Sequence, residues 1–382
     1  MTIRCMVLGC GLMGRAVAYD LSRCEKVEHV VLGDIDVSRA ESLARSLGPN
    51  VSAVRVDARK REQLIEMFSK VDAVASCVSY SVNLLHTEAA IEAGCHLTDL
   101  GGNLHVVMEQ LKLSSEASDR GVTIIPDCGL APGLTNVLAS ALIERLSDVS
   151  SVKIRVGGLP QRPRPPLNYS IVFSTEGLIN EYVEPCMVLR SGKIAYEEPL
   201  TETERIVFPE PFGELEAFNT SGGSSTLPIT YQGKVMSLDY KTIRYPGHAD
   251  KMLCMKQLGL MDSTPHEFDG IRVAPRRVLE RLLETNLPPF ERDVTLLRVT
   301  VSGREGRHSR TYEYEMIDYY DDSTGLSSMM RTTAFPQSIV TVMTADGTIG
   351  KRGVIPPETA VEADSLISEL ARRNVKIVER TP

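Results

Sequence analysis

Apolar and polar positions are arranged in two different ways along the 382 residues. In the first third, each short β-branched apolar run is followed by a stretch with the three- and four-residue apolar spacing of a helix. Strands that alternate with helices in this way are typical of a parallel, doubly wound sheet. The predicted strands end at Asp34, Asp57, Tyr80, Gly102 and Asp127, and helical patterns fill 60–69, 83–93 and 104–119.

The pattern changes beyond residue 149. Between about 149 and 325 the sequence favours strands with irregular connections, interrupted by helical stretches near 247–258 and 275–286. Runs of strands with few helices between them predict a mainly antiparallel sheet in an α+β domain. Segment 160–167 is too rich in proline for a central strand, so we predict a loop there. From about 326 the spacing is helical again.

Three segments follow from these patterns. We predict a Rossmann-type domain over 1–130, a second, α+β domain over 131–325, and a C-terminal helical segment over 326–382. The predicted fold class is therefore α/β, with an N-terminal doubly wound parallel sheet and a second domain built on a mainly antiparallel sheet.

The first predicted strand runs into a G-x-G-x-x-G motif formed by Gly9, Gly11 and Gly14. In this motif the first glycine permits a tight turn, the second lets the backbone approach a pyrophosphate, and the third lets helix and strand pack closely. The pyrophosphate then lies at the positive end of the helix dipole, beside Leu12 and Met13. A glycine turn without a ligand is the alternative, but strand, glycines and helix agree on a dinucleotide site.

Asp34 ends the second predicted strand, twenty residues beyond Gly14. A carboxylate there accepts hydrogen bonds from ribose hydroxyls and repels a 2'-phosphate, so we predict NAD as the cofactor in preference to NADP. Ligands of such sheets bind beyond the carboxyl ends of the strands. Further cofactor contacts are therefore predicted at the ends of the later strands, at Asp57, Cys77, Val78, Tyr80, Gly101 and Cys128.

Composition narrows the class of protein. A net charge of −8 and an isoelectric point near 5.5 argue against nucleic acid or an anionic membrane as a partner. No apolar run approaches the roughly 20 residues of a membrane helix, and the first residues run straight into a strand pattern without a signal peptide. The eight cysteines lack metal-binding spacing, so we predict no metal site and a reducing cytoplasmic location.

Several longer segments carry a more specific signal, and they are spread over almost the whole chain. They read "GCGLMGRAVAYDL", "DLGGN", "GVTIIPDCGLAPG", "VGGLPQRPRPPLNY", "EAFNTSGGSSTL", "YKTIRYPGHADK" and "KRGVIPPE". Together they resemble the saccharopine dehydrogenase-like superfamily, and most of all its lysine 6-dehydrogenase branch. The resemblance implies that 131–325 binds substrate and forms a homodimer, and that 326–382 returns to the first domain.

What the resemblance implies chemically is oxidative deamination of L-lysine at its ε-carbon. The hydride passes to NAD, and the imine is hydrolysed to ammonia and 2-aminoadipate 6-semialdehyde, which cyclises to Δ1-piperideine-6-carboxylate. Two alternatives stay open: a saccharopine- or carboxynorspermidine-type condensing dehydrogenase that uses NADP, and an NAD-binding sensor without turnover. Ala131 stands in "GLAPG" where the saccharopine reductases carry an acidic residue, which places saccharopine itself in doubt.

Asp99 and Asp127 are acidic candidates in the first domain. Asp99 ends the fifth strand before two glycines, where it would hold the substrate amine and carry protons during imine formation and hydrolysis. Asp127 occupies a similar position after the sixth strand and is a candidate for substrate binding. The alternative for both is an aspartate that caps a helix or a turn.

Segment 240–248 is the candidate for binding the substrate. The planar fork of Arg244 matches a carboxylate, and backbone N–H groups of Thr220, Ser221 and Gly222 would add a nest for the same anion. His248 is the second acid–base candidate. Strand alternation places Lys241 and Tyr245 on the face opposite Arg244, although Tyr245 stays among the candidate substrate residues. The alternative for the whole segment is a solvated edge strand.

Overall fold

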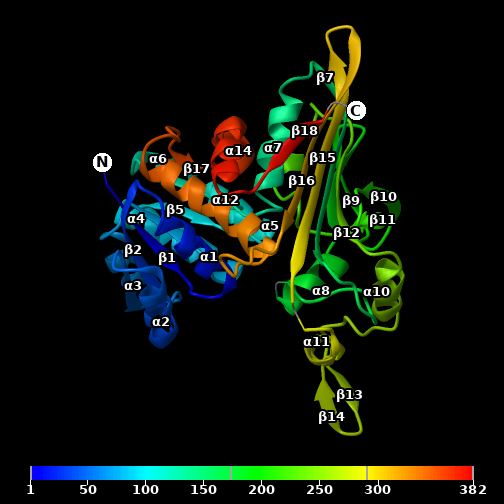
Figure 1. Cartoon of the computed structure of the whole chain (residues 1–382), viewed down its shortest axis with the longest axis horizontal. Coiled ribbons are helices and arrows are strands. Elements are labelled where there is room, and N and C mark those ends of the chain that lie inside the picture. The colour runs from blue at the N-terminus through cyan, green and yellow to red at the C-terminus, as the bar shows by residue number, and fades with distance from the viewer. Residues whose placement is uncertain (1, 173, 290, 381–382) are drawn as a thin grey trace. The chain divides into compact units, whose positions relative to one another are not determined.

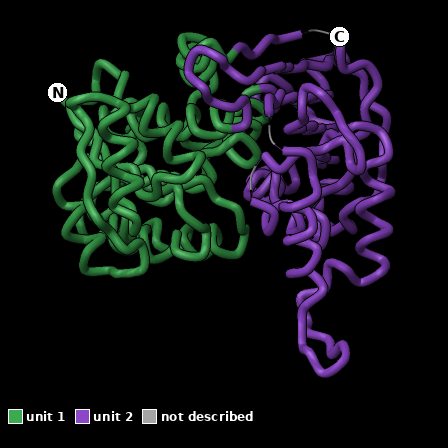
Figure 2. Tube along the Cα trace, turned by 60° about the horizontal axis from the view of Figure 1, so that its bottom comes forward, with its two compact units in different colours: residues 1–141, 330–375 green, residues 142–329, 376–382 purple. Residues whose placement is uncertain are grey.

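The computed structural model describes residues 2–172, 174–289 and 291–380 (Figure 1). Its chain forms two compact units, drawn in green and purple in Figure 2. Unit 1 comprises residues 1–141 and 330–375, and unit 2 comprises residues 142–329 together with the chain after Lys376. The sequence pattern places the boundaries at 130 and 325, whereas the chain passes between the units inside two helices.

Unit 1 is built on a seven-stranded sheet in which every neighbouring pair of strands is parallel. The strand order is β17-β6-β5-β4-β1-β2-β3, so the order of winding reverses between β1 and β4. A ligand of such a sheet binds where the order reverses. The strands are β1 (Ile3–Leu8), β2 (Val27–Asp34), β3 (Val51–Arg55), β4 (Ala73–Ser76), β5 (His96–Asp99), β6 (Thr123–Ile125) and β17 (Gly353–Val354).

Helices connect these strands and cover the sheet (Figure 1). The C-terminal part of unit 1 contributes to its core, because the Gln337 amide donates to the carbonyl oxygens of Ser76 and Thr98. The helices are α1 (Leu12–Leu21), α2 (Val37–Leu47), α3 (Arg61–Phe68), η1 (Tyr80–Val82), α4 (Asn83–Ala93), α5 (Leu104–Lys112), α6 (Ser114–Asp119), α7 (Leu134–Ile143), α12 (Ser328–Ala345), α13 (Pro357–Ala360) and α14 (Ala363–Arg372).

Unit 2 is built on a nine-stranded, mainly antiparallel sheet. Its order is β10-β11-β12-β7-β15-β16-β18, with β8 beside β12 and β9 beside β8, and β12–β7 is its parallel pair. The strands are β7 (Asp148–Pro160), β8 (Cys186–Arg190), β9 (Lys193–Glu197), β10 (Glu204–Phe208), β11 (Gly213–Asn219), β12 (Leu238–Arg244), β15 (Asp293–Glu305), β16 (His308–Tyr319) and β18 (Ile377–Arg380).

Four helices and a small hairpin complete unit 2. Helices α8 (Thr175–Val183), α10 (His248–Gln257) and α11 (Pro275–Asn286) gather at one end of the sheet (Figure 1), where their apolar residues share a core with Tyr169 and Phe218. The remaining elements are the short helix α9 (Leu227–Thr230) and a separate hairpin of β13 (His266–Phe268) and β14 (Ile271–Val273).

The predicted fold class is confirmed, because a parallel doubly wound sheet is followed by a mainly antiparallel one. Two local predictions are wrong, and one alternative is excluded. Segment 175–183 forms the helix α8, whereas the sequence predicts helices in this region only near 247–258 and 275–286; the Ser174 hydroxyl accepts from the Gly177 N–H at its start. The chain after Lys376 pairs as β18 with β16 rather than continuing the helical pattern. Strand β12 is buried throughout and lies between β11 and β7, so it is not a solvated edge strand.

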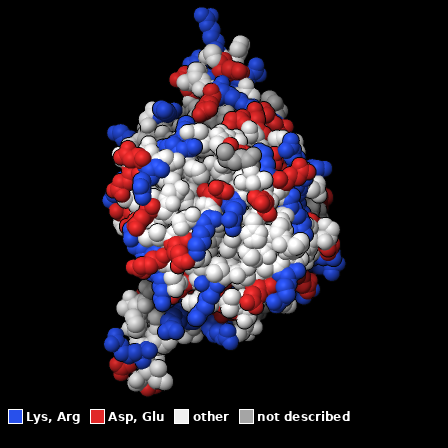
Figure 3. All heavy atoms as spheres, turned by 90° about the vertical axis from the view of Figure 1, so that its left-hand side faces the viewer, with Lys and Arg blue, Asp and Glu red and all other residues white. Residues whose placement is uncertain are grey.

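Acidic and basic side chains are interspersed over the face drawn in Figure 3, without a broad area of one sign. Across the described part of the chain, no helix combines the length and apolar character that crossing a membrane requires.

Candidate functional site

A hollow in unit 1 opens where the strand order reverses. Asp34 at the end of β2 lines it with its carboxylate held in place, because Oδ2 accepts from the Cys10 N–H at 2.7 Å and Oδ1 from the Asp36 N–H at 2.8 Å. A fixed acceptor at the end of the second strand suits the ribose hydroxyls of a dinucleotide. The lining residues are Leu8, Gly9, Gly33, Asp34, Ile35, Val56, Asp57, Ala58, Arg59, Val78, Ser79, Ser81 and Val82.

The glycines of the motif perform separate tasks in this structure. Gly9 has a φ of +94°, a left-handed conformation that L side chains rarely adopt. A Cβ at Gly14 would overlap the Gly9 carbonyl oxygen, whereas a Cβ at Gly11 would meet open space. Gly11 and Leu12 are exposed at the start of α1, and Met13 is half-buried. The first N–H groups of a helix lack intrahelical partners, so they are available to a pyrophosphate.

The structure divides the predicted cofactor residues into two groups. Gly9, Asp34, Asp57 and Val78 line the hollow. The others are not among the described residues that line it: Gly11, Leu12, Met13, Gly14, Cys77, Tyr80, Gly101 and Cys128. Sequence reasoning missed Ile35, Ala58, Arg59, Ser79 and Ser81, which lie beside predicted residues at the same strand ends and were within reach of the same rule.

Cys128 is turned into the core. Its side chain is 2% exposed and its thiol contacts the Ile125 carbonyl oxygen at 3.3 Å. Burial raises the thiol pKa of Cys128 well above its ordinary value. Cys77 is half-buried, its thiol contacts the Gln337 side chain at 3.3 Å, and burial of the sulfur raises its pKa. Both thiols are therefore protonated packing groups.

Asp99 ties two loops together. Its Oδ1 accepts from the N–H groups of Gly101 (2.7 Å) and Asp127 (3.3 Å), and its Oδ2 accepts from the Gln110 amide at 2.8 Å. The carboxyl is 1% exposed, and burial raises its pKa. This arrangement matches the turn-capping alternative, and the catalytic role of Asp99 stays a prediction.

Asp127 is also enclosed. It is fully buried and adopts a φ of +59°. A Cβ at Gly101 would overlap its carboxylate, which explains why the loop after β5 needs glycine at that position. Substrate binding by Asp127 stays a prediction, and the structure shows its backbone and side chain packed between the loops after β5 and β6.

In unit 2, a cluster of buried polar side chains surrounds Arg244, the last residue of β12. The guanidinium is 3% exposed and stacks over the Tyr169 ring, with Cζ 4.8 Å from the ring centroid. Its Nη2 lies 3.8 Å from the Glu181 carboxylate on α8. Burial alone would lower the pKa of Arg244, but Tyr182, Tyr169 and Glu181 together raise it. Arg244 therefore carries a fixed positive charge inside the unit.

His248 is locked behind this guanidinium. Its Nδ1 donates to the Leu167 carbonyl oxygen at 3.1 Å, which leaves Nε2 to accept from the Tyr182 hydroxyl at 3.0 Å. Burial and the charge of Arg244 lower the pKa of His248 to about 3. A neutral imidazole with both nitrogens engaged orients Tyr182, and the predicted acid–base role of His248 stays untested.

The segment before β12 contributes less to an anion site than the sequence predicts. The Ser221 N–H donates to the Glu181 carbonyl oxygen at 3.1 Å, so it is not available for a nest. The hydroxyl of Thr220 pairs with that of Thr242 at 2.6 Å. Gly222 adopts a φ of +87° in the turn that follows.

The two faces of β12 separate as strand alternation predicts. Lys241 donates to the Glu202 carbonyl oxygen at 2.6 Å and contacts the Glu204 carboxylate at 3.3 Å, away from the partners of Arg244. The Tyr245 hydroxyl donates to the Pro160 carbonyl oxygen at 3.0 Å, at the end of β7. Neither side chain joins the Arg244 cluster.

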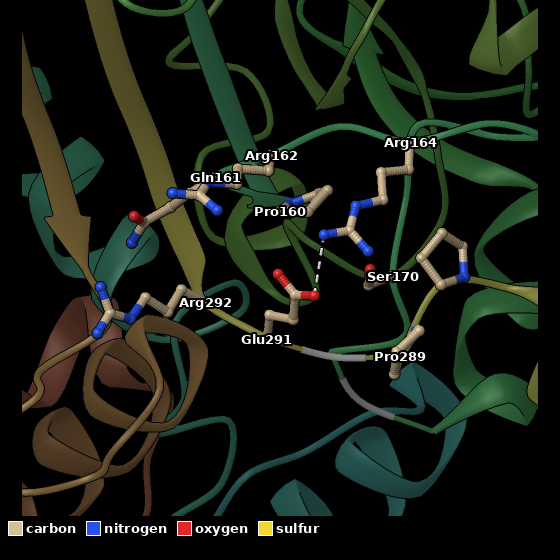
Figure 4. Close-up of a pocket in the computed structure, with 9 residues that line it drawn as sticks. Pro160, Gln161, Arg162, Arg164, Ser170, Pro289, Glu291 and Arg292 are labelled. Carbon is tan, nitrogen blue, oxygen red and sulfur yellow. Dashed lines mark ion pairs between the residues drawn. The ribbon is translucent and has the colours of Figure 1, made fainter.

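A second hollow, of about 190 Å³, lies in unit 2 and begins at Pro160. Figure 4 shows Arg164 and Glu291 facing each other in its middle, at 3.0 Å, whereas the Arg292 side chain points away from them. Arg292 pairs with Asp322 at 2.6 Å. Among the described residues Arg162 has no ion-pair partner. The lining residues are Pro160, Gln161, Arg162, Arg164, Ser170, Pro288, Pro289, Glu291 and Arg292.

Sequence reasoning missed Glu181, Tyr182 and Tyr169. A signal for α8 was present, because Ser174 is a good N-cap and Leu178, Ile179 and Tyr182 have helical spacing. No local signal connects α8 to Arg244. Within the described ranges, His, Cys, Asp and Glu side chains do not gather in groups of three that would hold a metal ion.

The chain is similar to known dehydrogenases over most of its length. The saccharopine dehydrogenase from Schizosaccharomyces pombe that uses NADP(+) and forms L-glutamate is 22% identical, with 98% of each chain covered. The mitochondrial alpha-aminoadipic semialdehyde synthase of Rattus norvegicus is 21% identical over 92% of this chain. The chain spans only 45% of the length of that protein.

Solved structures share the fold. An apo saccharopine dehydrogenase (L-Glu forming) from Saccharomyces cerevisiae superposes with a TM-score of 0.83 at 19% identity, covering 100% of both chains. The homospermidine synthase of Legionella pneumophila, in complex with NAD, gives 0.70 at 13% identity, covering 100% of this chain and 92% of its own.

Two family models cover nearly the whole chain. The saccharopine dehydrogenase NADP-binding domain matches residues 5–125, and the saccharopine dehydrogenase C-terminal domain matches residues 129–375. The first match contains the glycine motif and the hollow beside Asp34, and the second contains Arg244 and its cluster. The chain therefore belongs to the saccharopine dehydrogenase family of nicotinamide-dependent oxidoreductases.

Proposed function

We propose that this protein oxidises the ε-carbon–nitrogen bond of a lysine-derived amino acid, and that saccharopine is its substrate. A bound nicotinamide supplies a hydride acceptor. The ε-carbon loses a hydride and its nitrogen a proton to give an imine. Water then adds across the imine, and the carbon–nitrogen bond breaks to release 2-aminoadipate 6-semialdehyde and an amine. The amine is L-glutamate if saccharopine reacts and ammonia if L-lysine reacts.

Two relatives favour saccharopine. The proteins from Schizosaccharomyces pombe and Saccharomyces cerevisiae are both named as saccharopine dehydrogenases that form L-glutamate, and the matches cover 98% and 96% of this chain. Their sequence identity is low, so the substrate must be argued from the chain's own residues.

The observation that carries the proposal is the guanidinium-lined hollow next to the Arg244 cluster. Saccharopine has three carboxylates and lysine has one, so saccharopine needs cations beyond Arg244. Arg162 and Arg164 line this hollow against the single carboxylate of Glu291. The hollow neighbours the Arg244 cluster in the chain, because Ser170, which lines it, follows the stacked Tyr169. Guanidinium groups suit carboxylates because their donors are arranged as a fork.

L-lysine is the second candidate substrate. The Arg244 cluster pairs one cation, Arg244, with one carboxylate, that of Glu181. One cation and one anion suit the single α-carboxylate and α-ammonium group of one amino acid. Ala131 lies where the resemblance to the saccharopine reductases calls for an acid.

We also propose NAD as the cofactor in preference to NADP. Both oxygens of Asp34 are anchored by backbone N–H groups, so the carboxylate cannot swing away from a 2'-phosphate. Its negative charge would therefore disfavour NADP. Arg59 lines the same hollow, and its positive charge would favour the 2'-phosphate of NADP. The ratio of kcat/KM for NAD to that for NADP therefore measures which of the two charges dominates.

Product analysis tests the proposal. The purified protein is given saccharopine or L-lysine with NAD or NADP, and nicotinamide reduction, L-glutamate and ammonia are measured. We expect L-glutamate from saccharopine. Ammonia from lysine without L-glutamate from saccharopine would establish the second candidate. If neither compound supports reduction with either cofactor, the proposed function is wrong.

Variants of the hollow make the test specific. Replacing Arg162 and Arg164 with alanine should raise KM for saccharopine about 10-fold or more and leave KM for lysine unchanged, since a charged hydrogen bond contributes roughly 1.5–3 kcal/mol. Arg205→Ala is the matched control, because Arg205 forms an exposed pair with Glu214 on β10 and β11. An equal increase in KM for both substrates would contradict the proposal that the hollow binds the additional carboxylates of saccharopine.

A further inference from the structure

Glu181 and Arg244 form an ion pair with unused hydrogen-bonding capacity. Their nearest charged atoms are 3.8 Å apart, beyond the 2.7–2.9 Å of a charge-assisted hydrogen bond. Of the five guanidinium N–H donors, one on Nη1 donates to the Ile243 carbonyl oxygen at 3.0 Å. Nε is buried and has no hydrogen-bond partner among the described residues. A buried charge pair that is incompletely hydrogen-bonded is costly, so a ligand that completes it binds favourably.

The surroundings leave Glu181 as the accessible member of the pair. Its side chain keeps 28% of its surface exposed, whereas that of Arg244 keeps 3%. Tyr182 hydrogen-bonds to His248 and also interacts with the guanidinium, and Tyr169 covers one face of the guanidinium. A solute that reaches the pair therefore meets a carboxylate first and a guanidinium with free donors behind it.

From this geometry we propose that Glu181 and Arg244 together bind the α-amino-acid head of the substrate, Glu181 taking the α-ammonium group and Arg244 the α-carboxylate. The inference rests on the proposed function, and it holds for saccharopine and for L-lysine because both carry the same lysine head. It assigns Glu181 a role in specificity, because a ligand that carries the carboxylate but lacks the α-ammonium group would be repelled by Glu181.

The ionisation of Glu181 supports this role. Burial raises its pKa to about 7, although Arg244 acts in the opposite direction. A bound ammonium favours the ionised carboxylate, so amino-acid binding should weaken as the pH falls below about 7. The other titratable groups of the cluster do not change charge there, because burial raises the pKa of each tyrosine and lowers that of His248. They are Tyr169, Tyr182, Tyr240 and His248.

A structural ion pair is the competing explanation, and paired ligands separate the two. L-lysine and 6-aminohexanoate differ only in the α-ammonium group. We expect the wild-type protein to bind L-lysine at least 10-fold more tightly by calorimetry. Glu181→Gln, which keeps the shape and removes the charge, should abolish most of that preference. Glu176→Gln is the control: it removes a carboxylate charge from the first turn of the same helix and should leave the preference for L-lysine unchanged.

The outcomes distinguish the inference from the proposed function. If Glu181→Gln melts normally and keeps the preference for L-lysine, Glu181 does not bind the ammonium group. The inference also fails if the wild-type protein binds neither L-lysine nor saccharopine, or binds 6-aminohexanoate as tightly as L-lysine. If the preference exists and depends on Glu181 while no substrate reduces NAD or NADP, the head-group assignment stands and the proposed function fails.

Discussion

Replacing Arg244 with lysine tests how the buried cluster of unit 2 binds a carboxylate. Lysine keeps the positive charge near Glu181 but lacks the planar fork and cannot stack in the same way over Tyr169. Arg244→Ala is a poorer choice, because it would leave the half-buried Glu181 carboxylate without its counter-charge and so would also destabilise the fold. The conservative variant therefore separates substrate binding from folding.

The expected increase in KM follows from the N–H donors of Arg244 that lack a close hydrogen-bond partner. Nε has no partner among the described residues, and Nη2 only approaches Glu181 at 3.8 Å. A bidentate carboxylate would use both. Losing one charged hydrogen bond removes roughly 1.5–3 kcal/mol, or about 10- to 150-fold in affinity. We expect Arg244→Lys to raise KM for the amino-acid substrate by about that factor.

Arg155→Lys provides the matched control. Arg155 is buried in the neighbouring strand β7, and its guanidinium already pairs with two carboxylates, those of Glu204 and Asp239, each at 2.5 Å. Its Nη2 has no hydrogen-bond partner among the described residues, but the two carboxylates already balance its charge. Its replacement should lower the melting temperature and leave KM unchanged. Fluorescence titration should show normal NADH binding in both variants, because the residues lining the cofactor hollow all belong to unit 1. Wild-type KM and kcat in Arg244→Lys would refute the carboxylate clamp.

Two further predictions concern a second charge and a buried imidazole. Asp34→Ser should reduce the ratio of kcat/KM for NAD to that for NADP by about 10-fold or more, because removing the carboxylate removes its repulsion of the 2'-phosphate; an unchanged ratio would assign the preference to other residues. Folded His248 has a pKa near 3, against 6.5 when unfolded, so the unfolded chain binds the proton first as the pH falls. Stability is therefore lost below pH 6.5, by about 3 kcal/mol at about pH 4, and urea titrations should show a shallower pH dependence in His248→Gln.

Features that depend on neighbouring residues could be predicted from the sequence. The glycine motif, the strand before it and Asp34 lie within one β-α-β unit, and their spacing alone predicts the part of the hollow that Gly9 and Asp34 form. The opposite orientation of Lys241 and Arg244 also followed from strand alternation.

Contacts between distant segments could not be predicted in this way. Glu181 reaches Arg244 only because α8 packs beside the end of β12, and Gly177 weakens the helical signal of α8. The short strand β18 exists because β16 offers a free edge for pairing, which its own four residues do not encode. The sequence correctly predicts Asp99 at the end of a strand. It does not predict that the Asp99 carboxylate accepts from Gln110, because Gln110 lies on helix α5, further along the chain.

Burial in unit 2 separates the two parts of a substrate that the proposed reaction must treat differently. The proposed head-group pair joins helix α8 to the end of β12, and Arg244 is held there because it is 3% exposed and its neighbours Tyr169 and His248 are buried beside it. The guanidinium groups of Arg162 and Arg164 stand on an exposed, proline-rich loop after β7. Substitutions there would change which amine departs without disturbing the lysine head, because exposed loop residues carry little of the packing energy. Under the proposed function, a buried head site and an exposed hollow would therefore allow the departing amine to vary while the oxidised carbon stays the same.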